Sequence, residues 1–496
     1  MTSAPVDVLI VGAGNAALCA ALSAREHGAS VTVLEAAHHG ERGGNTWFTA
    51  GAMRVVYDGV DDLRQLMPEL TDKQVEETDF GTYPADRFFE DMARVTEYRT
   101  DPDLAEVLIT RSFDTLDWMR AKGVRFMPIY GRQAFKVDGR FRFWGGLTVE
   151  VNGGGPGLVE SLTEACEREG IEILYDTRAV ELHREGDRVD GVTVRQHGEP
   201  RRLEASTVIL ASGGFEADAA WRAQYLGPGW DVAKVRGTRF NVGDGIKMAL
   251  DIGASAAGNW SGAHAVAWDM NAPEFGVTTI GDGYSKLSYP FGLMINADGE
   301  RFVDEGADFR NYTYAKYGRR ILEQPNQLAY QVFDAKVAHL LRDEYRIREV
   351  STVKADTLEG LAERMEGVDP TGFLETIEAY NAAVDQETPF DPNVKDGRGT
   401  SGIRPPKTNW ANTIDEPPFE AFQTTCGITF TFGGLRVTPG TAAVHDVDGR
   451  EIPGLYACGE LVGGLFYFNY PGGTGLTSGS VFGRIAGEAA ATSVRS

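Results

Sequence analysis

The first 46 residues restrict the fold more than any other stretch of the sequence. The apolar run from Val6 to Val11 predicts a buried parallel strand, and it leads directly into Gly12-Ala13-Gly14-Asn15-Ala16-Ala17. A helix is expected from Ala20 to Gly28, and a second strand from Ser30 to Leu34 ends on Glu35. In such a unit the glycines let the backbone approach a pyrophosphate, the helix N-terminus favours its charge, and the acid binds a ribose. The sequence therefore predicts a Rossmann-like unit for an adenine dinucleotide, either NAD or FAD.

Charge and length limit the functions open to the chain. At 496 residues it is long enough for more than one domain, since single cores stop growing near ~250–300 residues. The net charge of −24 argues against nucleic acid or an anionic membrane surface as a partner. An anionic small-molecule substrate would need a local cluster of cationic side chains.

The cysteines and the apolar runs bear on the compartment. Four cysteines lie far apart without a C-x-x-C pair, so buried free thiols are expected and no metal site is predicted. A reducing cytoplasm fits this pattern. No apolar run approaches the ~20 residues of a transmembrane helix, and a secretory signal is not expected because the first strand starts at Val6. The cysteines are Cys19, Cys166, Cys426 and Cys458.

The alternation of strands and helices changes along the chain and suggests three segments. Residues 1–257 carry the first nucleotide-binding unit and a second strand-to-glycine turn, 207–215. Residues 258–428 are irregular and aromatic-rich, which predicts an inserted α+β capping domain. Residues 429–496 return to a short strand and a closing helix and complete the first domain. The ranges expected to be helical are 103–119, 158–169, 246–250, 334–342, 357–365, 370–385 and 476–491, and 389–418 is expected to be a loop.

Further glycine-rich turns favour FAD over NAD. The pair Gly43-Gly44 lies just past Glu35, and Gly473-Thr474-Gly475 leads into the last helix, whose N-terminus would favour the negative charge of a reduced flavin. The predicted FAD-binding residues are Gly12, Gly14, Asn15, Ala16, Glu35, Gly43, Gly44, Asn45, Thr46, Gly51, Val180, Ala211, Ser212, Gly213, Asp244, Glu460, Thr474, Gly475 and Leu476.

Several motifs together resemble one family. GAGNAA, GGNT, ASGG, GDG, INADGERFVDE and LYACGE followed by GGTGL are similar to the soluble fumarate reductase and succinate dehydrogenase flavoproteins, over nearly the whole chain. Within that family, segments 310–322, 407–411, 427–437 and 466–476 most resemble FAD-dependent tricarballylate dehydrogenases, which oxidise tricarballylate to cis-aconitate. The resemblance implies an α/β fold with a Rossmann-like FAD-binding domain, a mobile capping domain, and an active site between them.

The sequence departs from the family at positions that matter. Membrane-bound relatives attach FAD to a histidine where this chain has Asn45, so noncovalent FAD is expected. The Thr-Glu pair of soluble fumarate reductases falls at Tyr284-Ser285, the late histidine near Thr429-Phe430, and the late arginine at Tyr470. The fumarate-type carboxylate clamp is thus largely absent. Tyr470 followed by proline instead resembles 3-ketosteroid Δ1-dehydrogenases, in which the tyrosine holds a ketone oxygen.

The resemblance also points to catalytic candidates. Arg310 matches the arginine that donates a proton in the reducing direction; because a guanidinium is nearly always protonated, Tyr289, Tyr312 or Tyr314 is an alternative base. A surface salt bridge is the other interpretation of Arg310. His264 aligns with a histidine that binds a substrate carboxylate by a charge-assisted hydrogen bond, although a lone histidine is often structural.

The remaining candidates concern the substrate. Tyr470 is expected to contact a substrate oxygen, and Tyr289, Thr429 and Phe430 to bind substrate. Arg236 and Arg239 are candidates for binding anions.

Three hypotheses for the function follow. The first is an FAD-dependent dehydrogenase that introduces a C=C bond α,β to a carboxylate or carbonyl, with a tricarballylate-like substrate and hydride transfer to flavin N5. The second changes the substrate to a cyclic ketone. The third is a non-catalytic FAD-binding electron-transfer subunit. Because no iron–sulfur or haem motif is present, electrons are expected to leave to oxygen, a quinone or an electron-transfer protein.

Overall fold

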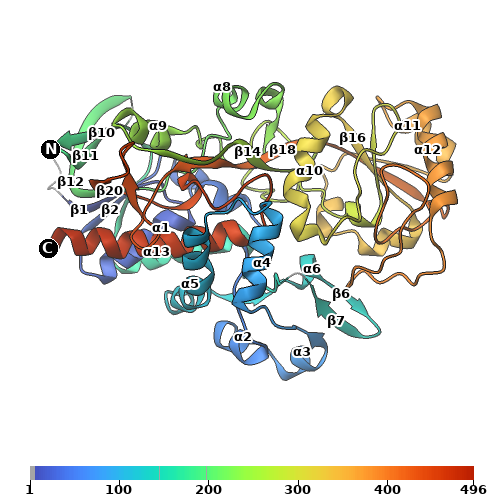
Figure 1. Ribbon diagram of the computed structural model, residues 1–496, viewed down its shortest axis with the longest axis horizontal. Helices are drawn as coiled ribbons and strands as arrows, with labels where there is room; N and C mark the ends of the chain where they lie inside the picture. Colours follow the sequence, from blue (N-terminus) through green and yellow to red (C-terminus); the bar gives the residue numbers. More distant parts are fainter. Residues whose placement is uncertain (1–5, 145, 197, 496) are drawn as a thin grey trace.

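The computed structural model describes residues 6–144, 146–196 and 198–495, and they form an elongated molecule with a sheet toward each end (Figure 1). The sheet near the two termini has the strand order β10-β11-β12-β1-β2-β9, and β20 pairs with β12. β1 lies between β12 and β2, parallel to both, as expected for a Rossmann-like unit. Its strands are β1 (Val6–Val11), β2 (Val31–Leu34), β9 (Glu172–Leu174), β10 (Thr177–Glu185), β11 (Arg188–Gln196), β12 (Glu199–Leu210), β19 (Ala443–His445) and β20 (Glu451–Ala457).

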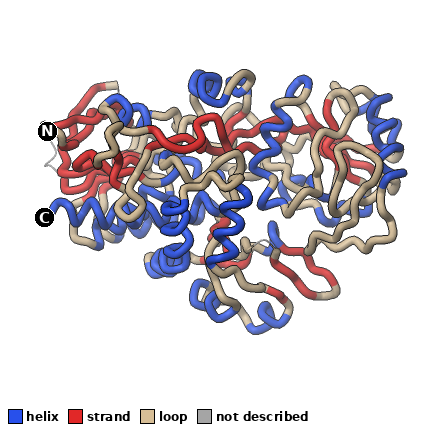
Figure 2. Tube along the Cα trace, in the orientation of Figure 1, coloured by secondary structure: helices blue, strands red, loops and turns tan. Residues whose placement is uncertain are grey.

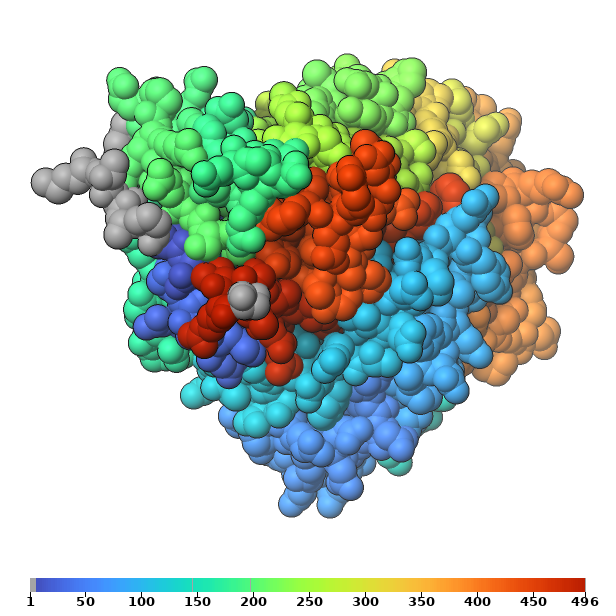
Figure 3. Space-filling model, turned by 60° about the vertical axis from the view of Figure 1, so that its left-hand side comes forward, coloured from blue at the N-terminus to red at the C-terminus, as the bar shows by residue number. Residues whose placement is uncertain are grey.

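The C-terminal part of the chain completes this first sheet. β20 is parallel to β12, with Leu455 beside Val208, which confirms the prediction that the last segment returns to the nucleotide-binding fold. In Figure 3 the C-terminal segment lies between segments from the first half of the chain. The four cysteines are buried and free, also as predicted.

The helices α1 (Asn15–Glu26) and α13 (Thr474–Arg495) pack against each other through small residues. A Cβ built at Gly483 would lie 2.4 Å from the Ala16 carbonyl oxygen, and one at Gly487 would lie 2.2 Å from that of Ala20. The two backbones are therefore in direct contact. The predicted start of the first helix at Ala20 was wrong, because Gly14 is its N-cap and the helical turn begins at Asn15.

A long helical excursion follows the first two strands and covers one side of the molecule (Figure 1). Its longest helix, α5, has Asp101 as N-cap and proline in its first turn, and it confirms the helix predicted at 103–119. The elements of this part are β3 (Ala52–Met53), α2 (Val60–Leu66), α3 (Asp72–Glu76), β4 (Thr78–Asp79), α4 (Ala85–Val95), α5 (Pro102–Ala121), β5 (Phe126–Pro128), α6 (Tyr130–Gln133), β6 (Ala134–Val137), β7 (Arg140–Phe143), β8 (Val149–Val151) and α7 (Gly154–Arg168).

The second sheet is built around two long antiparallel strands, β14 and β18, which run from the first sheet toward the far end of the molecule (Figure 2). The predicted domain boundaries at 257/258 and 428/429 fall inside these strands, and the division into domains stays a prediction. The strands and helices here are α8 (Ala219–Trp221), β13 (Lys234–Val235), α9 (Asp244–Asp251), β14 (Ala256–Asp269), β15 (Leu293–Asn296), α10 (Tyr314–Leu322), β16 (Ala329–Phe333), β17 (Thr352–Ala355), α11 (Leu358–Arg364), α12 (Pro370–Ala383) and β18 (Phe419–Leu435).

Most local predictions for this half are confirmed, with one exception. α11 and α12 lie where helices were expected, and residues 389–418 contain neither helix nor strand. The helix predicted at 334–342 is instead a 3-10 helix over Ala335–Leu340, capped by the Asp334 carboxylate. No helix in the described parts of the chain combines the length and the apolar character needed to cross a membrane.

The contact between α1 and α13 gives a stability prediction. Gly487→Ala should lower the free energy of unfolding by about 1–3 kcal/mol, because the new methyl group would overlap the Ala20 carbonyl oxygen. Alanine has a higher helix propensity than glycine by up to ~1 kcal/mol, so propensity alone would stabilise the variant. A loss of stability would therefore report the steric overlap. Gly440→Ala is the matched control, since no described atom lies within 4 Å of its Cβ. An unchanged melting temperature for Gly487→Ala would contradict the backbone contact.

Candidate active site

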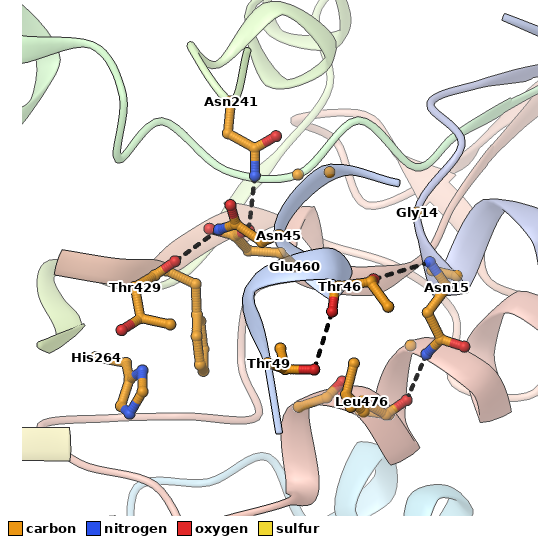
Figure 4. Close-up of a pocket in the computed structure, with 18 of the residues that line it drawn as sticks. Gly14, Asn15, Asn45, Thr46, Thr49, Asn241, His264, Thr429, Glu460 and Leu476 are labelled. Atoms are coloured by element: carbon orange, nitrogen blue, oxygen red, sulfur yellow. Dashed lines mark hydrogen bonds between the residues drawn. The ribbon is translucent and has the colours of Figure 1, made fainter. Parts of the chain in front are cut away.

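One large cavity extends from the N-terminus of α1 to the region between the two sheets (Figure 4). It brings together segments that are far apart in the sequence, including the first glycine turn, the turn after β12 and the start of α13. The predicted FAD-binding residues that line it are Gly12, Gly14, Asn15, Ala16, Glu35, Gly44, Asn45, Thr46, Ala211, Ser212, Gly213, Asp244, Glu460, Gly475 and Leu476.

The glycine turn at the start of α1 fits a pyrophosphate. Gly12 has a φ of +108° and its Cβ would lie 2.3 Å from the Ala211 carbonyl oxygen, so the turn itself requires glycine. A Cβ at Gly14 would meet protein atoms only at ordinary contact distance, 3.5 Å from Thr46 Oγ1. The space that glycine leaves at this position faces the cavity. The N-cap Gly14 supplies no capping side chain, and Thr46 Oγ1 accepts from the Asn15 N–H at 3.0 Å, so the later N–H groups of the first turn of α1 are left for an anion.

Polar side chains complete this end of the cavity. The Glu35 carboxylate accepts hydrogen bonds from the backbone N–H groups of Ala13 (3.1 Å) and Ala37 (2.9 Å), and burial raises its pKa. It is held at the end of β2, where a ribose hydroxyl is bound in dinucleotide folds. Ser212 Oγ lines the same cavity and is buried without a hydrogen-bond partner among the described residues. These groups fit an FAD molecule.

Five of the predicted cofactor- and substrate-binding residues lie outside the set that lines this cavity. Gly43 and Gly51 shape the backbone beside it, with φ values of +93° and +72°. Val180 follows three lining residues on β10, and Thr474 is buried with its hydroxyl donating to the Pro471 carbonyl oxygen at 2.7 Å. Tyr289, predicted to bind substrate, is fully buried, and its hydroxyl shares a 2.6 Å hydrogen bond with Thr313.

The inner end of the cavity holds a charged cluster. Arg236 donates to the Asp282 carboxylate at 2.7 Å, and Arg132 donates to its other oxygen at 2.6 Å. Arg236 also donates to Thr429 Oγ1 at 3.2 Å. Burial acts to raise the pKa of Asp282, but the guanidinium groups of Arg236 and Arg132 outweigh it and keep the pKa below its usual value. The sequence alone did not suggest Arg132 or Asp282.

Arg310 extends this cluster. It lies only 6% exposed, so the interpretation as a surface salt bridge was wrong. Its guanidinium donates to the backbone carbonyl of Arg132, and no described carboxylate forms an ion pair with it. Burial and the neighbouring charge of Arg132 lower its pKa, although Glu344 acts in the opposite direction. The inner end of the cavity is therefore lined by three guanidinium groups, two of which pair with Asp282.

An aromatic group faces the charged cluster. The His264 ring lies 4.9 Å from that of Tyr314, 4.8 Å from Tyr470 and 5.1 Å from Phe430, measured between centroids. The hydroxyl groups of Tyr314 and Tyr470 are 2.5 Å apart. Burial raises the pKa of both tyrosines, so both are neutral hydrogen-bond donors near pH 7.

His264 differs from its predicted role in one respect. Burial, and secondarily the charge of Arg236, lower its pKa well below the usual value, so the ring is neutral at physiological pH. The ring itself therefore offers one uncharged N–H donor, and a hydrogen bond from it to a substrate carboxylate stays a prediction. Neither ring nitrogen has a partner among the described residues. Tyr312, one of the candidate bases, does not line the cavity; its hydroxyl donates to Asp91 at 2.5 Å.

Fold and cavity together define a dinucleotide-binding protein with a second site between its two sheets. A family model described as FAD binding domain matches residues 7–476, and the chain belongs to this family. The cofactor is FAD. The Asn45 amide, at the position for which noncovalent FAD was predicted, donates to Glu216 (2.6 Å) and to the Thr429 carbonyl (2.7 Å).

Relatives of known activity cover almost the whole chain. The probable fumarate reductase Ifc3 of Shewanella frigidimarina is 29% identical over 99% of this chain and 75% of its own length. The 3-oxosteroid 1-dehydrogenase of Mycolicibacterium smegmatis is 26% identical over 100% of this chain and 99% of its own length. The open conformation of a flavocytochrome c3 fumarate reductase has a TM-score of 0.73 at 26% identity and covers 100% of this chain and 79% of that one. The α/β flavoprotein fold is thereby confirmed.

The two glycines of the turn have separable roles. Gly14→Ala should weaken FAD binding at least tenfold, because the methyl group fills the space that a pyrophosphate approaches. The free energy of unfolding of this variant should change by no more than about 1 kcal/mol. Gly12→Ala should instead destabilise the fold itself, by about 1–3 kcal/mol, through its positive φ and its contact with Ala211. FAD fluorescence titration and thermal unfolding check both variants. Equal effects on stability would contradict this assignment.

Proposed function

We propose that this chain is an FAD-dependent dehydrogenase that introduces a C=C bond α,β to a carboxylate of a small polycarboxylate such as tricarballylate. It is an FAD-dependent oxidoreductase acting on CH–CH groups, as the enzymes to which it is similar are. One observation supports the substrate class above all. In a protein of net charge −24, the inner end of the cavity is lined by three guanidinium groups, those of Arg132, Arg236 and Arg310, and by one carboxylate, that of Asp282.

The charged cluster suits an anionic substrate because its positive charge is not fully compensated. Asp282 accepts from Arg132 and Arg236. Glu344 is buried near Arg310 but forms no ion pair with it, so two carboxylates accompany the three guanidinium groups. Bringing a substrate carboxylate to Arg310 would neutralise a buried charge, and charge-assisted hydrogen bonds of this kind are about twice as strong as neutral ones. A second carboxylate on the substrate would meet Arg236 or Arg132.

The residues also suit removal of an α proton. A guanidinium beside a carboxylate stabilises the negative charge that develops as the adjacent C–H bond breaks. The lowered pKa of Arg310 reduces the cost of its neutral form, which proton relay through this group requires. The bound FAD supplies the hydride acceptor. Tyr314 and Tyr470, kept neutral by burial, are donors to a substrate oxygen.

A cyclic ketone is the second candidate substrate. The paired hydroxyl groups of Tyr314 and Tyr470 and the surrounding rings of His264, Phe430 and Phe466 favour an apolar ring with one carbonyl. One relative is a 3-oxosteroid 1-dehydrogenase. In this case the tyrosine hydroxyls would donate hydrogen bonds to the carbonyl oxygen. The arginine cluster would then contribute only to the electrostatic potential of the cavity.

Anaerobic flavin bleaching separates the two substrate classes. Tricarballylate added to the oxidised holoenzyme should bleach the flavin absorbance, and saturated cyclic ketones should not. Dicarboxylates of the same backbone test whether a third carboxylate is needed. If only ketones bleach the flavin, the polycarboxylate proposal fails and the alternative holds.

Two variants assign the roles of the residues. Arg310→Ala should slow flavin reduction by tricarballylate by about 10²–10⁴-fold, the usual contribution of an acid–base group. Tyr470→Phe should slow it by less than about tenfold, because only one hydrogen bond of ~1 kcal/mol is lost. With a ketone substrate the order would reverse, since a donor to a developing oxyanion is worth about 10²–10³-fold. Stopped-flow measurement of the half-reaction gives both values.

A further inference from the structure

Two glutamates meet beside the cofactor cavity: Glu216, which is fully buried and was not suggested by the sequence, and the partly buried Glu460, which was predicted. Glu216 follows the turn after β12, and Glu460 follows β20 in the short helix η10 (Gly459–Leu461). Because β12 and β20 are parallel neighbours, their carboxyl ends reach the same edge of the sheet. Glu460 lines the cavity, and Glu216 lies behind it with no exposed surface.

The two carboxyl groups share their surroundings. Glu216 Oε1 accepts from Asn45 Nδ2 at 2.6 Å and from Asn241 Nδ2 at 2.7 Å. Glu460 accepts from the Thr431 backbone N–H at 2.9 Å and from the same Asn241 amide at 3.4 Å. Figure 4 shows Asn45, Asn241 and Glu460 converging at this point. Glu216 Oε2 is buried and accepts from no donor among the described residues.

No described cation pairs with either carboxyl group. The guanidinium nearest to Glu216 along the chain, that of Arg222, donates to the Glu216 backbone carbonyl at 2.6 Å rather than to its carboxylate. Its other donors go to the carbonyls of Trp230, Asp231 and Ala233. The groups that face the pair from the 3-10 helix η2 (Gly44–Phe48), from the turn before α9 and from β18 are neutral: Asn45, Asn241 and Thr431. Two negative charges would therefore stand together, uncompensated, in a buried site.

We infer that Glu216 and Glu460 share one proton at neutral pH, with the protonated Glu460 donating to Glu216, so that the cavity wall carries one negative charge instead of two. Burial raises the pKa of both groups, and the charge of Glu216 raises that of Glu460 further, well above its usual value. Glu216 is thus a positioning residue that acts through Glu460.

The shared proton links FAD binding to pH. FAD brings two phosphate charges into the cavity that Glu460 lines, so it binds better while the pair keeps its proton. As pH rises through the upper pKa of the pair, the second carboxyl ionises and binding weakens. A single linked proton changes the dissociation constant by at most about tenfold per pH unit. The affinity for FAD should therefore fall above neutral pH.

Glutamine variants distinguish a proton shared by Glu216 and Glu460 from a proton held by one of the two carboxyl groups alone. Infrared spectra of the holoenzyme should contain the C=O band of a protonated carboxyl, shifted in D2O, and both Glu216→Gln and Glu460→Gln should abolish it. In the first variant Glu460 loses the neighbouring charge that raises its pKa beyond the effect of burial. In the second, Glu216 keeps its two amide donors and ionises without a neighbouring carboxylate. Glu274→Gln is the matched control, because this exposed carboxylate also interacts with Arg222 but faces away from the pair, and the band should persist.

FAD titration at a series of pH values provides the second readout. The wild-type chain and Glu274→Gln should lose affinity for FAD above neutral pH. Glu216→Gln cannot carry two charges at this site, so its dissociation constant for FAD should not change above neutral pH. At the highest pH this variant should bind FAD more tightly than the wild type does. Absence of the carboxyl band in the wild-type holoenzyme would overturn the inference. So would a band that survives Glu216→Gln, or an alkaline loss of affinity that this variant retains.

Discussion

The direct backbone contact between α1 and α13 is the constraint on which the cofactor cavity depends. The glycines of α13 allow the two helices to approach until the carbonyls of Ala16 and Ala20 touch the opposite backbone. The same approach lets Asn15 donate to the Leu476 carbonyl at 2.8 Å, so the two helix N-termini open into one cavity. Residues separated by more than 450 positions thus act as one binding surface for the cofactor.

The strand β18 connects that surface to the substrate end. Successive side chains of a strand point to opposite faces, and three consecutive residues use this alternation. Thr429 and Thr431 face the polar side, where they contact Arg236 and Glu460, while Phe430 lies against the ring of His264 from the neighbouring β14. β18 therefore places one residue beside each of three features: Thr429 beside the charged cluster, Phe430 in the aromatic group and Thr431 beside the glutamate pair.

How far the sequence predicts the site depends on the range of the interactions involved. The glycine turn, Glu35 and the strand ends are local patterns, and they predicted the FAD-binding residues that line the cavity. Asp282, in contrast, meets Arg132 across 150 positions and Glu216 meets Asn45 across 171, and no spacing rule identifies such pairs. Local patterns also did not reveal burial, which makes His264 neutral.

A continuous hydrogen-bonded path links the two charged features of the cavity. Glu216 accepts from Asn45, Asn45 donates to the Thr429 carbonyl, and the Thr429 hydroxyl accepts from Arg236. The acidic pair and the arginine cluster are thus held apart by one amide and one hydroxyl, both neutral. Because opposite charges of this size would otherwise pair and cancel in a buried site, the neutral spacer keeps the arginines available for an anion. Asn45 is the centre of that spacer.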